Sequence, residues 1–256
     1  MFRILTYNVH HCRGTDGRLS PSRIAEVIAS CRPDIVALQE LDVGRPRTGG
    51  VDQAHEIAQE LGMHMLFHPS IRVMEEQYGN AILTSLPAQL VKAGALPGRP
   101  GLEPRGALWA RVQIGGASLQ VINTHLGLRR PERLLQVDAL LGPEWLGHPS
   151  CREPRVLLGD FNALPRSRVY QRLVAQLKDA QTSHHVRRPA ATFPARLPLA
   201  RIDHVFVGSA VEILRVEALR TPLARVASDH LPLLVEFHFP PAPERSPRGS
   251  AIHQPT

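Results

Sequence analysis

The chain has 256 residues, 43% of them hydrophobic, and carries a formal net charge of +7 at pH 7. This length and apolar content exclude a wholly disordered chain, because about 240 residues can enclose a substantial core. The charge, which comes almost entirely from arginine, favours nucleic acid, anionic lipid or phosphorylated metabolites as partners. Arginines scattered over a solvated surface explain the same charge, since no dense basic block occurs.

The cysteines and the apolar runs bear on the compartment. Cys12, Cys31 and Cys151 are widely spaced and form no Cys-x-x-Cys pair, so we expect reduced structural thiols. The first strand starts without a secretory signal, and no apolar run approaches the roughly 18 residues of a membrane span. We therefore expect a cytoplasmic protein without stable membrane insertion, and a monomer by default.

Four outer helices are predicted, each from a start signal, an apolar stripe and a stop. Ser20 caps the first helix with Pro21 at its first turn, and Arg32-Pro33 ends it. The other three are expected between Asp52 and Gly62, between Pro131 and Gly142, and from Ser167 through Leu177.

About eleven strand-like runs lie between these helices. They are residues 2–6, 35–38, 81–83, 90–91, 108–114, 117–122, 156–158, 205–207, 213–219, 226–227 and 233–239. Gly115-Gly116, between two of the runs, is the strongest hairpin signal. Several runs are continuously apolar rather than alternating, which implies burial on both faces. Two stacked sheets with helices outside satisfy this pattern.

Five short polar clusters each come where an apolar run stops. They are Tyr7-Asn8-Val9-His10, Gln39-Glu40, Asn123-Thr124-His125, Gly159-Asp160-Phe161-Asn162 and Ser228-Asp229-His230. Sheets bring strand ends to a common edge, so side chains from distant parts of the chain can converge there on one pocket. This arrangement is typical of a metal-assisted active site.

The residue types point to a hard metal ion and a phosphate ester. Glu40, Asp160 and Asp229 are hard oxygen ligands, and Asn8 and Asn162 are neutral oxygen donors. Such a set suits Mg²⁺ or Mn²⁺ rather than a thiolate-bound metal. A divalent cation neutralises phosphoryl charge, a carboxylate activates the attacking water, and imidazolium or amide groups stabilise the developing negative charge.

Each cluster taken alone has a plainer explanation. Asn8 fits a turn, His125 fits a core histidine, and Asp229-His230 fits a helix cap or an ion pair. Glu40 is the sharpest signal, because a carboxylate at a buried strand end is costly unless it is paired or metal-bound.

Three neighbouring positions carry further expectations. Asp160 and Asn162 are expected on one side of an extended backbone, although an ordinary turn fits as well. Asp42 is expected to be solvated. His10-His11 either supply another substrate contact or fill a loop, and we favour the loop.

The clusters, together with Arg201-Ile202-Asp203-His204, resemble the endonuclease/exonuclease/phosphatase superfamily. They follow the family's motif order over residues 2 to about 239. The resemblance implies an α/β (α+β) protein, a four-layer αββα sandwich with two mixed, mostly antiparallel sheets and outer helices. Residues 1–239 are then the catalytic domain. Residues 240–256 are rich in proline and poor in apolar side chains, so we expect a disordered tail.

The resemblance also implies roles around a metal ion. Glu40 is expected to be the principal metal ligand, with Asn8 and Asp229 nearby in the metal and phosphate shell. Asp160 is expected to orient or deprotonate the attacking water. Asn162 is expected to hold that water or a phosphoryl oxygen.

Two histidines receive roles in the same way. His230, oriented by Asp203, is expected to donate to the phosphoryl oxygens in the transition state. His125 is expected to do the same from the other side. Glu76, by its position before Tyr78, is expected to be the partner of His125.

We therefore expect a Mg²⁺- or Mn²⁺-dependent phosphodiester hydrolase that acts by in-line attack of water without a covalent intermediate. Nucleic acid is the first expected substrate because of the basic charge. A phospholipid or sphingolipid headgroup comes second and a soluble phosphorylated metabolite third. The rival from another class is an inactive phosphate-binding module, which the complete set of chemical residues argues against.

Overall fold

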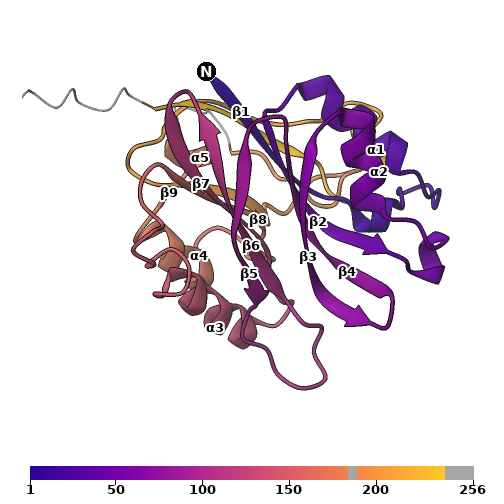
Figure 1. Ribbon diagram of the computed structural model, residues 1–256, viewed down its shortest axis with the longest axis horizontal. Coiled ribbons are helices and arrows are strands. Elements are labelled where there is room, and N and C mark those ends of the chain that lie inside the picture. Colours follow the sequence, from indigo (N-terminus) through magenta and orange to yellow (C-terminus); the bar gives the residue numbers. More distant parts are fainter. Residues whose placement is uncertain (184–188, 240–256) are drawn as a thin grey trace, which may run out of the picture.

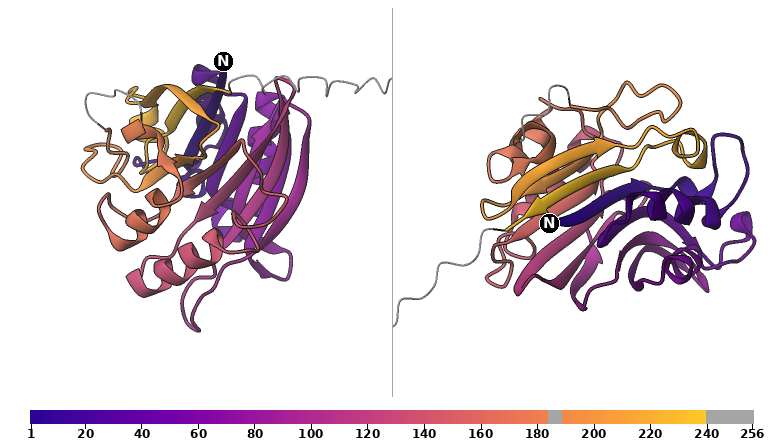
Figure 2. Two further views of the ribbon diagram at one scale, coloured as in Figure 1. Left: turned by 90° about the vertical axis from the view of Figure 1, so that its left-hand side faces the viewer. Right: turned by 90° about the horizontal axis from the view of Figure 1, so that it is seen from above.

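The computed structural model of the protein describes residues 1–183 and 189–239. Two six-stranded sheets face each other, and helices cover their outer faces (Figures 1 and 2). This confirms the predicted four-layer αββα sandwich. The predicted tail, residues 240–256, lies outside the described residues.

Each sheet has one parallel pair of strands at its centre, and its other pairs are antiparallel. The first sheet has the order β11-β12-β1-β2-β4-β3, with β1 and β2 parallel. Its strands are β1 (Phe2–Asn8), β2 (Ile35–Val43), β3 (His64–Val73), β4 (Glu76–Thr84), β11 (Glu212–Ala218) and β12 (Leu233–His238).

The second sheet repeats this plan, with the order β5-β6-β7-β8-β10-β9 and with β7 and β8 parallel. Its strands are β5 (Ala88–Ala95), β6 (Gly106–Ile114), β7 (Ala117–His125), β8 (Arg155–Asp160), β9 (Lys178–Asp179) and β10 (Asp203–Val207). We call the edge at which β1, β2, β7 and β8 end the carboxyl edge.

The helices begin largely where their capping residues predict. Ser20, Asp52 and Ser167 accept hydrogen bonds from the first turns of α1, α2 and α4. The helices are α1 (Pro21–Cys31), α2 (Gln53–Leu61), α3 (Arg130–Leu141), α4 (Arg168–Val174), α5 (Ala180–Ser183) and α6 (Ala224–Ala227), with 3₁₀ turns η1 (His10–Cys12) and η2 (Pro46–Thr48).

Several details differ from the sequence prediction, which also lacks β9 and α5. The fourth predicted helix ends at Val174 rather than continuing through Leu177. Residues 226–227 belong to helix α6, not to a strand. Strand β3 was not predicted, because Pro69 interrupts its pattern; β3 lies at the edge of its sheet, where a missing backbone donor is tolerated.

Apolar side chains form a core between each pair of layers. Ile4 and Ile35 of the first sheet and Val156 of the second belong to the core between the sheets. Neighbouring residues on the same strands, such as Val36 and Leu157, face the helices instead. Burial on both faces explains why these strands read as continuous apolar runs.

Gly159 provides a test of how closely β7 and β8 approach each other. Its φ is 141°, and a Cβ atom placed there would lie 1.8 Å from the carbonyl oxygen of Thr124 on β7. We expect Gly159→Ala to lower the free energy of unfolding by about 2–6 kcal/mol, from backbone strain plus overpacking.

Urea denaturation measures this loss, with Gly17→Ala as the matched control. Gly17 has a φ of 78° but open space around its Cβ position, so only the backbone strain of about 1–2 kcal/mol should appear. If the two substitutions lowered the free energy of unfolding equally, the close approach of β7 and β8 would contribute nothing to the effect.

Candidate active site

Glu40 lies on β2 where the pairing with β4 is interrupted. The register shifts between Leu38 and Leu41, and the backbone of Glu40 has a φ of 63°. A bulge of this kind re-aims a side chain, and a left-handed residue other than glycine costs roughly 1–3 kcal/mol. The surrounding sheet thus holds Glu40 in a strained conformation at the carboxyl edge.

Asn8, at the end of β1, connects carboxylates from the two sheets. Its Nδ2 donates to Oε1 of Glu40 at 2.9 Å and to Oδ2 of Asp160 at 3.0 Å. Its Oδ1 accepts from the backbone nitrogen of His10 at 3.1 Å. The structure therefore brings the ends of β1, β2 and β8 to one point.

His230 lies between two carboxylates. Its Nδ1 is 2.8 Å from Oδ2 of Asp203, and its Nε2 is 3.7 Å from Oδ2 of Asp160. The Thr192 hydroxyl donates to the same Asp203 oxygen at 2.5 Å. Because Asp203 accepts from Nδ1, the Nε2 side of the ring faces Asp160 and the pocket.

His125, at the end of β7, is held by an arginine. Nη1 of Arg105 lies 3.0 Å from Nδ1 of His125. A guanidinium can only donate, so Nδ1 accepts and the neutral ring carries its proton on Nε2. That nitrogen lies 3.5 Å from Oδ2 of Asp160 and 3.9 Å from Oε1 of Glu40. Arg105 also pairs with Glu103 at 2.7 Å.

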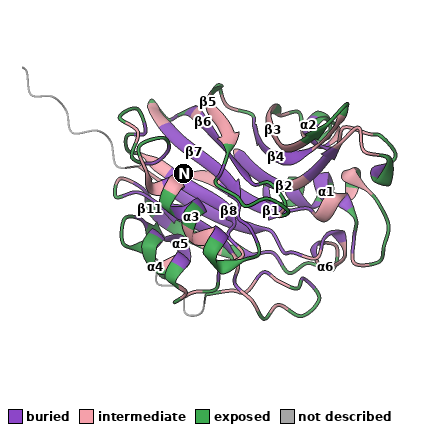
Figure 3. Cartoon of the chain, turned by 90° about the horizontal axis from the view of Figure 1, so that it is seen from below, coloured by how far each residue is buried: buried purple, intermediate pink, exposed green. Residues whose placement is uncertain are grey.

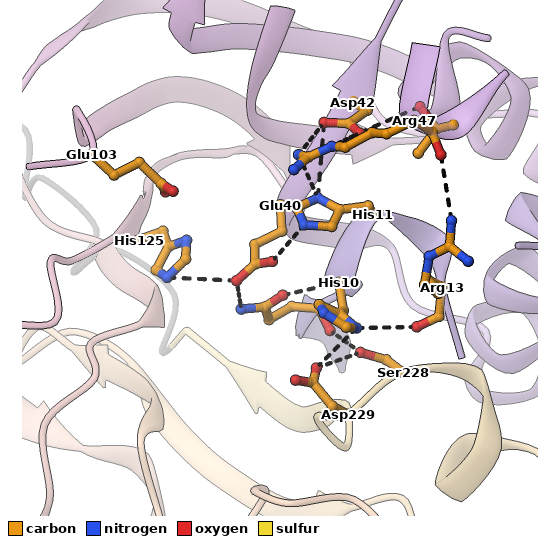
Figure 4. Close-up of polar contacts among 12 residues, drawn as sticks. His10, His11, Arg13, Glu40, Asp42, Arg47, Glu103, His125, Ser228 and Asp229 are labelled. Atoms are coloured by element: carbon orange, nitrogen blue, oxygen red, sulfur yellow. Dashed lines mark hydrogen bonds and ion pairs between the residues drawn. The ribbon is translucent and has the colours of Figure 1, made fainter. Parts of the chain in front are cut away.

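Asp229 lies at the mouth of the site, with its side chain 34% exposed. Its Oδ1 is 4.0 Å from Nδ1 of His10, and the hydroxyl of the preceding Ser228 donates to the backbone oxygen of Asn8 at 2.8 Å. Figure 4 shows Asp229 on one side of the Glu40 carboxylate and His125 on another. Ser228 thus ties the loop that carries Asp229 to the end of β1.

Asn162 lies at the site, but its backbone conformation differs from the expected extended one. Its backbone has a φ of 48°, and its nitrogen donates to Oδ1 of Asp160 at 2.8 Å. The chain turns at this point rather than running extended, as the alternative of an ordinary turn predicts. Nδ2 of Asn162 donates to the Leu126 oxygen. It also lies 3.2 Å from Nε2 of His125, but with the proton on Nε2 both nitrogens are donors and this contact is not a hydrogen bond.

The pairing of Glu76 with His125 is wrong. Oε2 of Glu76 lies 3.4 Å from Nε of Arg45, so the turn at the start of β4 directs Glu76 to that arginine. His125 has Arg105 as its partner. The sequence contains a signal for Arg105, because this charged residue directly precedes the apolar run that forms β6. In the structure it is buried at the carboxyl edge.

Two further expectations near the site are also wrong. Asp42 is fully buried, and Arg47 donates to both of its oxygens at 2.6 and 2.7 Å. His11 does not merely fill a loop, because its Nε2 lies 3.6 Å from Oε2 of Glu40 and its Nδ1 lies 3.0 Å from Arg47 (Figure 4). Burial and the adjacent Arg47 lower the pKa of His11 to about 4.

A pocket of about 460 Å³ opens onto these groups. Eight of the nine predicted site residues, all but Glu76, have been described at the site above. Six of them line this pocket directly: Glu40, His125, Asp160, Asn162, Asp229 and His230. Tyr78 and Phe193 add apolar surface to its wall. The pocket therefore combines carboxylates, imidazoles and arginines with a limited apolar wall.

Burial perturbs the charges in this pocket. It raises the pKa of Asp160 to about 7, with a further contribution from Asp203, and it also raises the pKa of Glu40. Burial opposes protonation of His230, but Asp203 and Asp160 outweigh it and raise the pKa of the imidazole to about 10. The pKa of His125 falls well below its usual value through burial and Arg105.

Two groups of side chains offer donor atoms for a divalent cation. The ligand atoms of Asp160, Asp203 and His230 lie within 4.8 Å of one another. However, Asp203 and His230 already bond each other, and Thr192 occupies the same Asp203 oxygen. Their bonding capacity is therefore partly used.

The second group is Glu40, Asn8 and Asp229, which fits a hard cation better. Glu40 and Asp229 both offer carboxylate oxygens at the pocket, and burial and the nearby Asp229 raise the pKa of Glu40. Asn8 presents its amide nitrogen to Glu40 and Asp160, so its oxygen joins the ligand set only with the amide turned over.

Comparison with known proteins agrees with this architecture. A sequence profile described as the Endonuclease/Exonuclease/phosphatase family matches residues 5–230. The protein YbhP of Escherichia coli strain K12 is 29% identical over 250 residues, covering 93% of this chain and 96% of YbhP.

Solved structures share the fold. A mannosyl-6-phosphatase from Bacteroides thetaiotaomicron superposes with a TM-score of 0.75 at 20% identity, covering 93% of this chain and 100% of that one. The human Nocturnin catalytic domain, with bound sulfate, gives a TM-score of 0.71 at 21% identity, with 93% of each chain covered.

The fold and the pocket define a hydrolase of phosphoester bonds. The chain belongs to the endonuclease/exonuclease/phosphatase family, as its motifs predict. Within residues 1–183 and 189–239, no helix combines the length and apolar character of a membrane span.

The two candidate cation groups can be separated by metal-induced stabilisation. We expect Mn²⁺ or Mg²⁺ to raise the melting temperature of the protein, by the equivalent of about 2.7 kcal/mol at 100 times the Kd. Glu40→Gln should abolish this increase, because it removes the carboxylate at the centre of the favoured group.

Asp203→Asn is the control, and it should keep most of the metal-induced increase. Differential scanning fluorimetry with and without chelator measures both variants. The reverse result would place the cation at Asp160, Asp203 and His230. In that case the metal would raise the melting temperature of Glu40→Gln but not that of Asp203→Asn.

Proposed function

We propose that the protein is a Mg²⁺- or Mn²⁺-dependent phosphodiester hydrolase that uses water as its nucleophile. The observation that carries the proposal is the bridge made by Asn8 between Glu40 and Asp160, beside the His230–Asp203 pair. Glu40 and Asp229 would hold the cation, with Asn8 beside them fixing the Glu40 carboxylate. When bound, the cation supplies positive charge to the phosphoryl oxygens and lowers the cost of charge build-up on them.

Asp160 is the group that orients and deprotonates water. Its Oδ1 accepts from the Asn162 backbone and its Oδ2 accepts from Asn8, so the carboxylate is fixed in the pocket. Asn162 lies beside it, where its amide can hold the same water or a phosphoryl oxygen. A fixed carboxylate next to the reacting water needs no covalent enzyme intermediate.

The two histidines stabilise negative charge on the phosphoryl group. Asp203 and Asp160 keep His230 protonated, and its Nε2 faces the pocket as a charged donor. His125 directs its Nε2 proton to the same region from the opposite sheet, because Arg105 occupies its Nδ1. Donors held in place before the reaction are the main source of such stabilisation.

The substrate is a phosphodiester within a polyanion or an anionic surface. The net charge of +7 supports nucleic acid as the first candidate. A phospholipid headgroup is the second candidate, and a specific observation favours it: exposed leucines lie on loops at the carboxyl edge, and one of them, Leu128, lines the pocket.

Replacement of Asp160 tests the proposed chemistry. We expect Asp160→Asn to lower kcat on a chromogenic phosphodiester by roughly 10²–10⁴-fold, because the water loses its oriented base. Asp138→Asn on the exposed surface of α3 is the matched control, and it should keep full turnover. Full activity of Asp160→Asn would show that another group activates the water.

The class of the protein is tested with the unaltered chain. Plasmid nicking, phospholipid cleavage and hydrolysis of a chromogenic phosphodiester should be compared with Mg²⁺, with Mn²⁺ and with chelator. We expect metal-dependent turnover on at least one substrate. Binding of phosphate compounds with no turnover on any of them would instead identify an inactive phosphate-binding module.

A further inference from the structure

The most exposed large apolar side chains gather at the carboxyl edge. In the described part of the chain, seven large apolar side chains are more than half exposed. All but Met1 lie at this edge, Val73 at the end of β3 and the others on loops: Met74, Leu128, Leu164, Leu197 and Leu199. Figure 3 shows the molecule from below with exposed residues in green, and many of the segments between the labelled strands and helices are green there.

The strand register fixes the position of these loops. His125 at the end of β7 pairs with Asp160 at the end of β8, and Asp160 pairs with Asp203 at the start of β10. The segments that follow β7 and β8 and the segment that precedes β10 therefore leave the sheet at the same edge. The turn between β3 and β4 lies at this edge too, since Gln77 pairs with Val43 near the end of β2.

Exposed arginines stand next to the leucines on three of these loops. Leu128 is followed by Arg129-Arg130, Leu164 by Pro165-Arg166, and Leu197 is preceded by Arg196. Residues 126–131, 161–168 and 189–201 contain no aspartate or glutamate. Among the described residues, no ion pair neutralises Arg129, Arg130, Arg166 or Arg168.

The three loops form an apolar and cationic surface with a specific chemical complement. Exposed leucines gathered at one edge are costly in water and mark a surface that another apolar phase covers. Nucleic acid neutralises arginines but has no apolar phase in which a row of leucines can be buried, and proteins that bind single strands present stacking aromatic rings instead. The surface of an anionic bilayer accepts both, with apolar side chains in the interfacial region and arginines at the lipid phosphates.

We propose that the carboxyl edge is a docking surface for a bilayer that contains anionic phospholipid. The leucines on the three loops enter the interface, and the adjacent arginines bind lipid phosphates. The active-site pocket lies within this ring of loops and faces the bilayer, so the phosphodiester of a lipid headgroup is the substrate class that docking presents. This statement about the substrate rests on the proposed function, whereas the docking itself does not.

Vesicle binding tests the docking surface without any turnover. The full chain is sedimented in the presence of chelator with vesicles of phosphatidylcholine alone or of phosphatidylcholine mixed with phosphatidylglycerol. We expect binding to the mixed vesicles that weakens as salt is raised, and much weaker binding to phosphatidylcholine alone.

Leucine variants test whether this edge makes the contact. Three exposed edge leucines are replaced together: Leu164→Ser, Leu197→Ser and Leu199→Ser. The control replaces three leucines exposed elsewhere on the surface: Leu90→Ser, Leu135→Ser and Leu214→Ser. The edge variant should bind mixed vesicles at least about tenfold more weakly, and the control should stay within about twofold of the unaltered protein.

Arginine variants test the anionic preference. Four edge arginines are replaced together: Arg129→Gln, Arg130→Gln, Arg166→Gln and Arg168→Gln. The preference for phosphatidylglycerol should fall by more than about tenfold, since each arginine near the surface contributes roughly fivefold.

Three results would overturn the proposal. They are no binding to mixed vesicles, equal weakening by edge and control leucine variants, and binding of oligonucleotides through the edge arginines with no vesicle binding. Turnover of a soluble phosphodiester by the unaltered protein is measured separately. Docking without any turnover would contradict the proposed function and leave the docking proposal standing. Turnover without docking would contradict the docking proposal and leave the proposed function standing.

Discussion

The active-site geometry depends on a small group of buried amides that joins the two sheets. Asn123 of β7 donates to the backbone oxygens of Leu38 and Ala81 in the first sheet at 2.9 and 2.8 Å, and it accepts from Gln39 at 2.8 Å. Each buried polar group left without a partner costs roughly 1–3 kcal/mol. The residues beside this contact are Glu40 and His125, so the amides set the distance across which the candidate catalytic groups face each other.

Backbone strain at the site follows from this frame. Glu40 and Asn162 both have positive φ values, as do His10 and His11, and all four line the pocket. Such conformations persist only where the surrounding structure determines them. The parallel strands and the Asn123 contact hold these backbone conformations in place. The candidate site side chains are therefore positioned before a substrate binds.

The layers and the convergence of the polar clusters were predictable from the sequence, because each has a local signal. Ser20 and Asp52 are strong helix starts, Gly115-Gly116 specifies a hairpin, and a two-sided apolar run such as 35–38 demands cover on both faces. What escaped prediction depends on contacts between distant segments. From the sequence Asp42 is predicted to be solvated, but in the structure Arg47 binds its carboxylate. The partner of His125 is Arg105, which a loop brings into place along a path that the sequence does not reveal.

Each parallel pair of strands supplies two side chains to the site, so the site depends on how the two sheets are placed against each other. Asn8 and Glu40 belong to one half of the sandwich, and His125 and Asp160 to the other. A slight slip of one layer over the other would separate these groups while both halves kept their secondary structure. Activity is therefore lost at a smaller displacement than secondary structure is. Turnover consequently reports a shift of one sheet against the other more sensitively than a spectroscopic measure of strand content does.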